Sequence, residues 1–245
     1  MKTTPRLHLD AGLEHHREIT LERDQAHYLT GVLRLAPGDP VSVFNARDGE
    51  WLAYLTDVGK KVVKIRCERQ VSAVILPPDI DYCFAPLKHA RLDYVVQKAT
   101  ELGARRLRPV MTQRTIAERV NLERMRANVV EAAEQCNLVF VPEVTEPVKL
   151  PALMLAWPKD RALVYCDETA AIADPLAALQ PLKAPVAVLI GPEGGFTDEE
   201  KALLKSLPFV TAISLGPRIM RADTAAVAAM TLVQAMLGDW HGKRE

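Results

Sequence analysis

The stretch VAVLIGPEGGFTDEEKALLKSLPFVTAISLGPRIMRADTAAVAAM, residues 186–230, decides the fold of this chain. Its first apolar run, Val186–Ile190, leads directly into the glycine-rich turn 191–195, and a second run, Thr211–Leu215, leads into the turn 215–218. A short, uninterrupted apolar run is typical of a strand buried on both faces of a parallel sheet. Two such strands that end in tight turns predict a pocket lined largely by backbone groups.

Helix signals follow both turns. Thr197 followed by three acidic residues forms a capping-box pattern, which predicts a helix that begins at about Asp198. Asp223 is expected to cap a last helix over 224–237, which ends at Gly238. On spacing alone, however, ordinary strand-to-helix turns would explain the same glycines. The turns lack the glycine spacing of a phosphate-binding loop or of a dinucleotide-binding fingerprint, so a phosphate cradle is disfavoured.

Strands and helices alternate through the rest of the chain after Asp81. Period-two or fully apolar runs predict strands, and apolar residues at helical spacing predict helices. The expected strands are 82–85, 107–110 and 162–166, and the expected helices are 92–102, ended by Gly103, and 121–136, capped by Asn121. Such alternation predicts an α/β fold with a parallel sheet covered on both faces.

The N-terminal part has a different pattern. One short helix is expected over 26–35, and alternating strands are expected over 41–44, 51–55 and 61–67. Asp48-Gly49 is a hairpin signal between two of them, and closely spaced short strands favour a barrel. Pro77-Pro78 is the expected linker. The sequence therefore predicts two domains, residues 1–75 and residues 76–245.

Composition excludes several classes of protein. The 245 residues are 49% hydrophobic with a net charge of zero, which suits a globular protein and argues mildly against a general nucleic-acid binder. The four cysteines are widely spaced, without a metal-binding pattern. No secretion signal or membrane-spanning run is found, so we expect a soluble cytoplasmic protein that is not membrane-bound. Residues 88–126 carry ten basic and four acidic residues, which fits either one basic face or a solvated helix surface.

Two long motifs carry a resemblance to a known family. LIGPEGGFTDEE and SLGPRIMRADTA together resemble the paired cofactor-binding loops of the SPOUT methyltransferases, in particular the bacterial 16S ribosomal RNA uridine-N3 methyltransferases. HYLTGVLRLAPGDPVSVFNARDGEW resembles the PUA-like N-terminal domain of the same family. LDYVVQKATELGARRLRPVMTQRT and EAAEQCNLVFVPEV extend the match to nearly the whole chain.

The resemblance implies a fold, a cofactor and partners. The fold would be a PUA-like, RNA-binding β-barrel followed by a parallel-sheet SPOUT domain with a C-terminal trefoil knot, assembled as a homodimer. The activity would be methyl transfer from S-adenosylmethionine to N3 of a uridine in 16S rRNA of the small ribosomal subunit. The residues that the resemblance assigns to the cofactor are Leu189, Ile190, Gly191, Glu193, Gly194, Gly195, Ser214, Leu215, Gly216, Ile219 and Met220.

Arginines after the second motif are the candidate catalytic residues. Methyl transfer by in-line displacement needs alignment and a deprotonated acceptor but no metal, so none is expected. Loss of the uridine N3 proton places charge on the flanking carbonyl oxygens, which a guanidinium could stabilise. Arg221 is the first candidate and Arg218 the second. Alternatively, Arg221 pairs with Asp223 or Glu193, and Glu193 itself could contact the sulfonium or accept the proton.

RNA contacts are expected from basic side chains, chiefly through phosphates. The candidates are Arg6, Arg34, Arg91, Lys98 and Arg114. Lys98 could equally form a helix-surface pair with Glu101, three residues further on. The chain also departs from the family at Leu138, where relatives usually carry a basic residue.

Two other functions remain open from the sequence. One is a SPOUT enzyme that acts on another acceptor, such as a ribose 2′-hydroxyl in transfer RNA. The other is a non-catalytic ribosome-assembly factor, although the intact glycines in both motifs argue against it.

Overall fold

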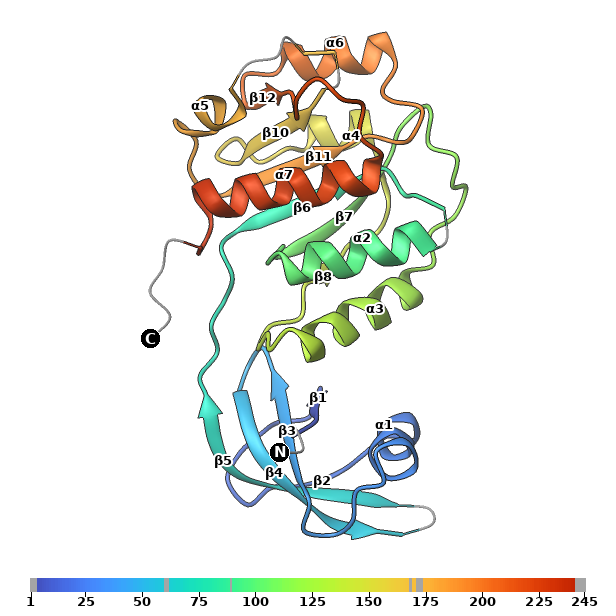
Figure 1. Ribbon diagram of the computed structural model, residues 1–245, viewed down its shortest axis with the longest axis vertical. Helices are drawn as coiled ribbons and strands as arrows, with labels where there is room; N and C mark the ends of the chain where they lie inside the picture. The colour runs from blue at the N-terminus through green and yellow to red at the C-terminus, as the bar shows by residue number, and fades with distance from the viewer. Residues whose placement is uncertain (1–3, 60–61, 89, 168, 171–173, 241–245) are drawn as a thin grey trace. The chain divides into compact units, whose positions relative to one another are not determined.

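The computed structural model describes residues 4–59, 62–88, 90–167, 169–170 and 174–240, and the chain divides into two compact units (Figure 1). Unit 1 comprises the chain up to Leu76 together with Ala133–Val141, and unit 2 comprises Pro77–Ala132 together with the chain from Pro142 onward. The first unit therefore includes a segment far along the chain, which the sequence placed in the second domain.

Unit 1 is built on one sheet with the strand order β1-β3-β4-β5-β2. The strands are β1 (Arg6–His8), β2 (Glu18–Thr20), β3 (Pro40–Asn45), β4 (Gly49–Val58) and β5 (Val63–Ser72). β1 runs parallel to β3, and the other neighbours are antiparallel. The hairpin expected at Asp48-Gly49 is confirmed, since it joins β3 to β4.

The helical segment of unit 1 begins earlier than the apolar pattern predicted. Helix α1 (Arg23–His27) is followed by the π-helical turn η1 (Tyr28–Val32), in place of one helix over 26–35. A capping box explains the early start, because the Gln25 side chain accepts a hydrogen bond from the Glu22 backbone N–H.

Unit 2 contains the predicted parallel sheet, with the strand order β12-β10-β11-β6-β7-β8 and with β9 also paired to β7. Its strands are β6 (Ile80–Phe84), β7 (Arg106–Met111), β8 (Glu143–Val144), β9 (Val148–Lys149), β10 (Ala162–Cys166), β11 (Val186–Ile190) and β12 (Val210–Ile213). Its helices are α2 (Ala90–Glu101), α3 (Leu122–Gln135, whose last three residues belong to unit 1), α4 (Leu150–Leu155), α5 (Pro175–Leu179), α6 (Asp198–Ser206) and α7 (Ala222–Leu237).

Helices cover both faces of this sheet (Figure 1). α4 and α6 pack on one face, where Leu150, Leu204 and the strand residue Leu189 share a core. α7 lies on the other face against β11 and α2. Successive side chains of a strand point to opposite faces. Since both faces of the sheet are covered, every residue of β11 is buried, as its apolar sequence predicted.

The predicted helix that follows the first motif is confirmed, and the prediction for the last helix needs one correction. The Thr197 hydroxyl accepts a hydrogen bond from Glu200 N, and the Glu200 carboxylate accepts one from Thr197 N, as a capping box requires. Asp223, by contrast, is not the cap of α7. The helix begins at Ala222 with Arg221 in the N-cap position, so Asp223 lies within the first turn and accepts a hydrogen bond from Thr224 N. Gly238 ends α7 as expected.

The trefoil knot implied by the resemblance stays a prediction.

None of the helices in the described part of the chain combines the length and the apolar character that crossing a lipid bilayer requires.

Candidate functional site

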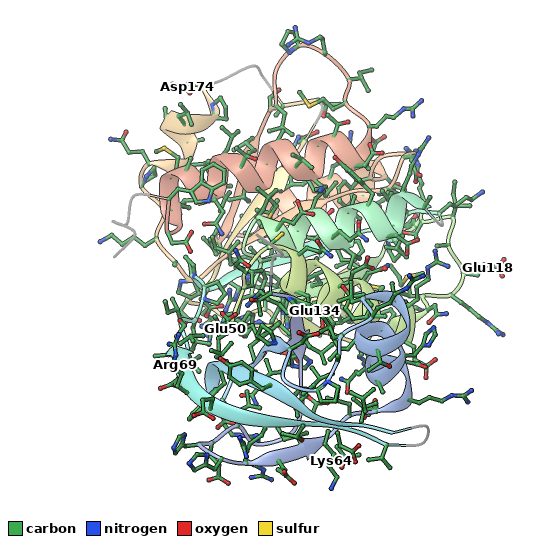
Figure 2. All side chains as sticks on the ribbon, turned by 60° about the horizontal axis from the view of Figure 1, so that its bottom comes forward. Glu50, Lys64, Arg69, Glu118, Glu134 and Asp174 are labelled. Atoms are coloured by element: carbon green, nitrogen blue, oxygen red, sulfur yellow. The ribbon has the colours of Figure 1, made fainter. Side chains whose placement is uncertain are left out.

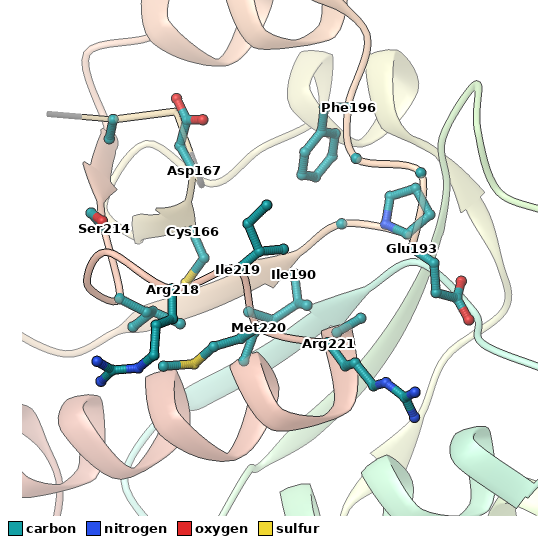
Figure 3. A pocket seen from close by; sticks show the side chains of 18 of the residues that line it. Cys166, Asp167, Ile190, Glu193, Phe196, Ser214, Arg218, Ile219, Met220 and Arg221 are labelled. Atoms are coloured by element: carbon teal, nitrogen blue, oxygen red, sulfur yellow. The ribbon is translucent and has the colours of Figure 1, made fainter. Parts of the chain in front are cut away.

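A cavity of about 690 Å³ lies at the carboxyl ends of β10, β11 and β12, between the loops that follow them (Figure 3). Loops at this edge of neighbouring parallel strands are a common place for ligands in α/β sheets. The cavity is lined by residues from both motifs: Ile190, Gly191, Pro192, Glu193, Gly194, Gly195, Phe196, Ser214, Leu215, Gly216, Pro217, Arg218, Ile219, Met220 and Arg221. The structure thus brings together every residue that the resemblance assigned to the cofactor except Leu189. Leu189 is fully buried and faces the core under α4 and α6.

The first loop requires glycine at Gly191 for reasons of space. A Cβ atom at this position would lie 2.5 Å from the ring of Phe196, which is itself buried and packs edge-to-face on Tyr165. Gly195 instead has a left-handed backbone, with φ of 67°, and its N–H donates to the Pro192 carbonyl oxygen at 2.9 Å. The loop is therefore a hydrogen-bonded turn that packs closely against the buried Phe196 ring.

The second loop is held by its own side chains and backbone. The Ser214 hydroxyl accepts a hydrogen bond from Gly216 N at 3.3 Å, and Gly216 adopts φ of 101°, a conformation that L side chains rarely adopt. Ile219 is 92% exposed, and it projects from the loop near the centre of the close-up in Figure 3. An apolar side chain in this position can pack on the flat face of a ligand.

The end of β10 supplies lining residues that the sequence reasoning missed: Cys166, Asp167 and Ala170. The strand 162–166 was predicted, and the carboxyl ends of parallel strands meet at one edge of a sheet. That signal could have placed Asp167 at the site. Burial raises the pKa of the Cys166 thiol to about 12, so it is protonated at neutral pH.

Asp167 is a buried carboxylate with several partners. The Lys205 ammonium lies 2.8 Å from its Oδ2, and the backbone N–H and the hydroxyl of Thr169 donate to its Oδ1. Burial alone would raise the pKa of this carboxyl, but Lys205 and Thr169 outweigh that effect and hold the pKa below its usual value. Asp167 is therefore charged at neutral pH.

The two candidate catalytic arginines are both exposed at the cavity. Their side chains point away from its centre in opposite directions in Figure 3, with Arg221 on the same side of the view as Glu193. Among the residues that the structure describes, Arg221 makes no ion pair with Asp223 or Glu193. Glu193 instead lies 3.7 Å from the Arg91 guanidinium. The alternative in which Arg221 is held by either carboxylate is thus not the arrangement found.

The other basic candidates of unit 2 have different surroundings. Arg91 lines the cavity, and Arg114 donates from Nη1 to the carbonyl oxygen of Gly194 at 2.9 Å. Lys98 donates to both carboxylate oxygens of Glu101 at 2.7 Å, which is the helix-surface pair considered as its alternative. Two of the three cations therefore contact or line the same site as the two motifs.

In unit 1, all three nitrogens of the Arg6 guanidinium donate hydrogen bonds to other residues of the same unit. It pairs with Glu50 and donates to the carbonyl oxygens of Ala133, Glu134 and Leu138, and its side chain is only 9% exposed. Glu50 and Glu134 are labelled in Figure 2, and the Glu134 carboxylate also accepts a hydrogen bond from His8 N. Arg34 is exposed, with a left-handed backbone of φ 55°.

Much of the positive charge over 88–126 is neutralised locally. Arg106 and Arg108 lie 2.8 Å and 3.4 Å from the carboxylate of the fully buried Asp81, which Arg161 also approaches. Burial raises the pKa of Asp81, and the three arginines oppose that effect only in part. Arg124 and Arg126 pair with Asp93 and Glu146. The basic excess in the sequence therefore does not form one continuous face.

Models of two known domain families match this chain. Residues 75–234 match the RNA methyltransferase domain, and residues 21–66 match the RNA methyltransferase PUA domain. A ribosomal RNA small subunit methyltransferase E from Rickettsia conorii is 29% identical, over 94% of this chain and 95% of that relative. A protein of the same name from Synechocystis is 32% identical, over 89% of this chain and 73% of that relative.

Solved structures show the same fold. A putative methyltransferase from Legionella pneumophila, in complex with S-adenosylmethionine, is 28% identical, covers 97% of this chain and 99% of its own, and has a TM-score of 0.83. A ribosomal RNA small subunit methyltransferase E from Neisseria gonorrhoeae, with a TM-score of 0.88 at 24% identity, supports the fold alone. The α/β fold with a PUA domain is confirmed. The chain belongs to the RNA methyltransferase family, together with the ribosomal RNA small subunit methyltransferases E.

Proposed function

We propose that this protein transfers a methyl group from S-adenosylmethionine to N3 of a uridine in 16S rRNA of the small ribosomal subunit. The observation that carries the proposal is the cavity at the strand ends, which is lined by both motifs. Its lining includes three arginines, Arg218 and Arg221 of the second motif and Arg91 of α2. Its volume is within the range of about 300–1,000 Å³ that is usual for small-molecule sites. The Legionella relative with the same fold was solved with S-adenosylmethionine.

The residues at the cavity fit this donor. When bound, S-adenosylmethionine supplies an electrophilic methyl group on a sulfonium, and the protein need not contribute a metal or a covalent intermediate. Backbone groups of Gly191, Gly194 and Gly216 can approach the donor closely because no side chain intervenes. Ile219 and Met220 offer apolar surface for the adenine ring.

Arg221 is our first candidate for the residue that stabilises the deprotonated uridine, followed by Arg218. A guanidinium can donate two parallel hydrogen bonds, which suits the charge that develops on the carbonyl oxygen beside a deprotonated N3. Glu193 lies 3.7 Å from the Arg91 guanidinium, in an ion pair between two partly exposed side chains. We assign no general base.

For RNA we propose phosphate contacts by Arg34, Arg91 and Arg114. Arg34 is exposed in unit 1, and Arg91 and Arg114 lie at or beside the cavity in unit 2. The surroundings of Arg6 and Lys98 give both residues a structural role, so we do not propose them as RNA contacts. We further propose a homodimer that acts in the cytoplasm, where its ribosomal substrate is assembled.

The direct test is to map the methylated nucleotide. Purified protein with S-adenosylmethionine is incubated separately with small ribosomal subunits, free 16S rRNA and transfer RNA, and the RNA is digested for mass spectrometry. We expect N3-methyluridine in 16S rRNA. Methyl transfer to a ribose hydroxyl of transfer RNA would overturn the acceptor, and the absence of both S-adenosylmethionine binding and methyl transfer would favour the non-catalytic assembly factor.

The variant Arg221→Ala tests the catalytic assignment. Loss of a preorganised donor to a developing anion lowers a turnover rate by roughly 10²–10³-fold, and we expect a loss of this size with little change in S-adenosylmethionine affinity. Single-turnover transfer and calorimetric titration of the donor measure the two effects separately. Arg119→Ala, which removes an exposed arginine from another loop, is the control. Unchanged turnover in Arg221→Ala would remove the assignment.

A further inference from the structure

The first loop is attached to a second segment of unit 2, the turn Thr112–Thr115 that follows β7. Thr112 N donates to the Thr115 hydroxyl at 3.0 Å, and Thr115 N donates to the Thr112 carbonyl oxygen at 3.2 Å, so the turn is closed on itself. Two contacts then join it to the first loop, one through Arg114 and one through Glu200.

The Arg114 contact fixes one peptide unit of the loop. Its Nη1 donates to the Gly194 carbonyl oxygen at 2.9 Å. The N–H of the same peptide unit belongs to Gly195, and it donates to the Pro192 carbonyl oxygen at 2.9 Å. Both polar ends of the peptide are therefore held, which determines the orientation that it presents beside the cavity. Gly194 and Gly195 have no Cβ to restrict that orientation, so the hydrogen bonds must do so.

The Glu200 contact fixes where the turn lies. Glu200 is only 4% exposed, and each of its carboxylate oxygens accepts a backbone hydrogen bond. Oε2 accepts from Thr197 N at 3.0 Å, at the end of the first loop, and Oε1 accepts from Gln113 N at 2.8 Å. One buried carboxylate thus ties the loop that follows β11 to the residue beside Arg114.

We propose that Arg114 and Glu200 are positioning residues for the donor-binding loop, and that they set the orientation of the Gly194–Gly195 peptide that meets S-adenosylmethionine. This inference rests on the proposed function. It gives Arg114 a role in donor binding that the sequence did not indicate, beside the phosphate contact proposed above. Arg114 acts through Gly194 and need not touch the donor itself.

The experiment measures donor affinity without RNA, on the full chain. We expect Arg114→Ala to weaken S-adenosylmethionine binding roughly tenfold in calorimetric titration. A tenfold loss is about the free energy of one hydrogen bond from a charged group, here the bond from the Arg114 guanidinium to the Gly194 carbonyl oxygen. In steady-state assays its KM for the donor should rise by a similar factor while kcat changes little. Arg114→Lys keeps one cationic donor and should recover part of the affinity. Glu200→Gln can accept only one of the two backbone hydrogen bonds, so it should also weaken donor binding.

Matched variants separate positioning from general effects. Arg119→Ala removes an exposed arginine from the same connection between β7 and α3, and Asp198→Asn removes an exposed carboxylate from the same first turn of α6. Both controls should bind the donor as the wild type does. Arg114→Ala is at an exposed position, and without donor it should unfold at the same urea concentration as Arg119→Ala.

Three outcomes decide the inference. Weakened donor binding in Arg114→Ala, with partial recovery in Arg114→Lys, supports it. A donor affinity within twofold of the Arg119→Ala value would overturn it and leave the proposed function intact. If the wild-type chain itself binds no S-adenosylmethionine, the proposed function fails, and this inference fails with it.

Discussion

The environment of Arg6 in the structure differs from the one that the sequence suggested. In the sequence it is one of several basic residues that could contact RNA. In the structure its side chain is nearly buried and saturated by Glu50 and three carbonyl oxygens. Nothing local marks this difference, because Glu50 and residues 133–138 are distant in the chain. The same is true of Leu189, since a uniformly apolar strand does not reveal which of its residues face a cavity.

We expect Arg6→Met to destabilise unit 1 by about 2–3 kcal/mol, because it leaves Glu50 without its guanidinium partner and three carbonyl oxygens without a donor. Urea unfolding followed by circular dichroism measures this change. Arg34→Ala removes an exposed arginine from the same unit and should leave the urea midpoint unchanged while it weakens RNA binding. Equal stability of the two variants would contradict the structural role of Arg6.

Asp167 gives a pH dependence with a defined sign. Its pKa in the folded protein lies below the ordinary value of 3.8, so the folded state gives up this proton more readily than the unfolded chain. The resulting stabilisation is present above the ordinary value and is lost as the pH falls through and below it. Urea midpoints between pH 7 and pH 3 should therefore decline more steeply for the wild type than for Asp167→Asn. The exposed Asp198→Asn variant should follow the wild type, and parallel curves for all three would contradict the assignment.

Among the structural elements, the first loop depends on the space beside one glycine. Gly191→Ala would place a methyl group against the Phe196 ring, so the ring or the loop must shift. We expect a loss of donor affinity of at least tenfold, together with a stability loss of about 1–3 kcal/mol, as in other overpacked cores. Calorimetry and thermal unfolding measure the two effects.

Gly194→Ala provides the matched comparison in the same loop. A Cβ atom there would make only an ordinary contact, 3.5 Å from the Arg114 Cβ. Its thermal stability without donor should stay within about 0.5 kcal/mol of the wild type, as for most surface substitutions. A Gly191→Ala variant as stable as Gly194→Ala would show that Phe196 moves aside without cost.

Elements with strong local signals were predictable from the sequence, and elements without them were not. β10 and β11 were predicted with their observed ends, and the Thr197 capping box located α6. The strands β1, β2, β8 and β9 are two or three residues long, so no period can show in their sequences. The start of α7 was misplaced because an acidic residue suits either the cap or the first turn of a helix. For the site, the two motifs gave nearly all of the cavity lining, but the contribution of the β10 end depended on tertiary structure.

For the whole molecule, we predict a dimer with a mass twice the 27.1 kDa of one chain. We place the dimer contact at the end of the last helix, where Trp240, just beyond α7, is 52% exposed and available for it. Trp240→Asp should shift the mass measured by light scattering toward one chain. Leu155→Asp, at a 91% exposed residue of α4 on the opposite face of the sheet, should leave the mass unchanged. A single-chain mass for the wild type at tens of micromolar would contradict the dimer.

Unit 1 takes its residues from two places in the chain, the part up to Leu76 and the segment Ala133–Val141. During translation, the first part is synthesised more than fifty residues before the second. Until then the Arg6 guanidinium lacks the three carbonyl oxygens that it contacts in the finished protein. The N-terminal part of a nascent chain can therefore complete its fold only after β6, β7 and the intervening helix α2 of unit 2 have been synthesised.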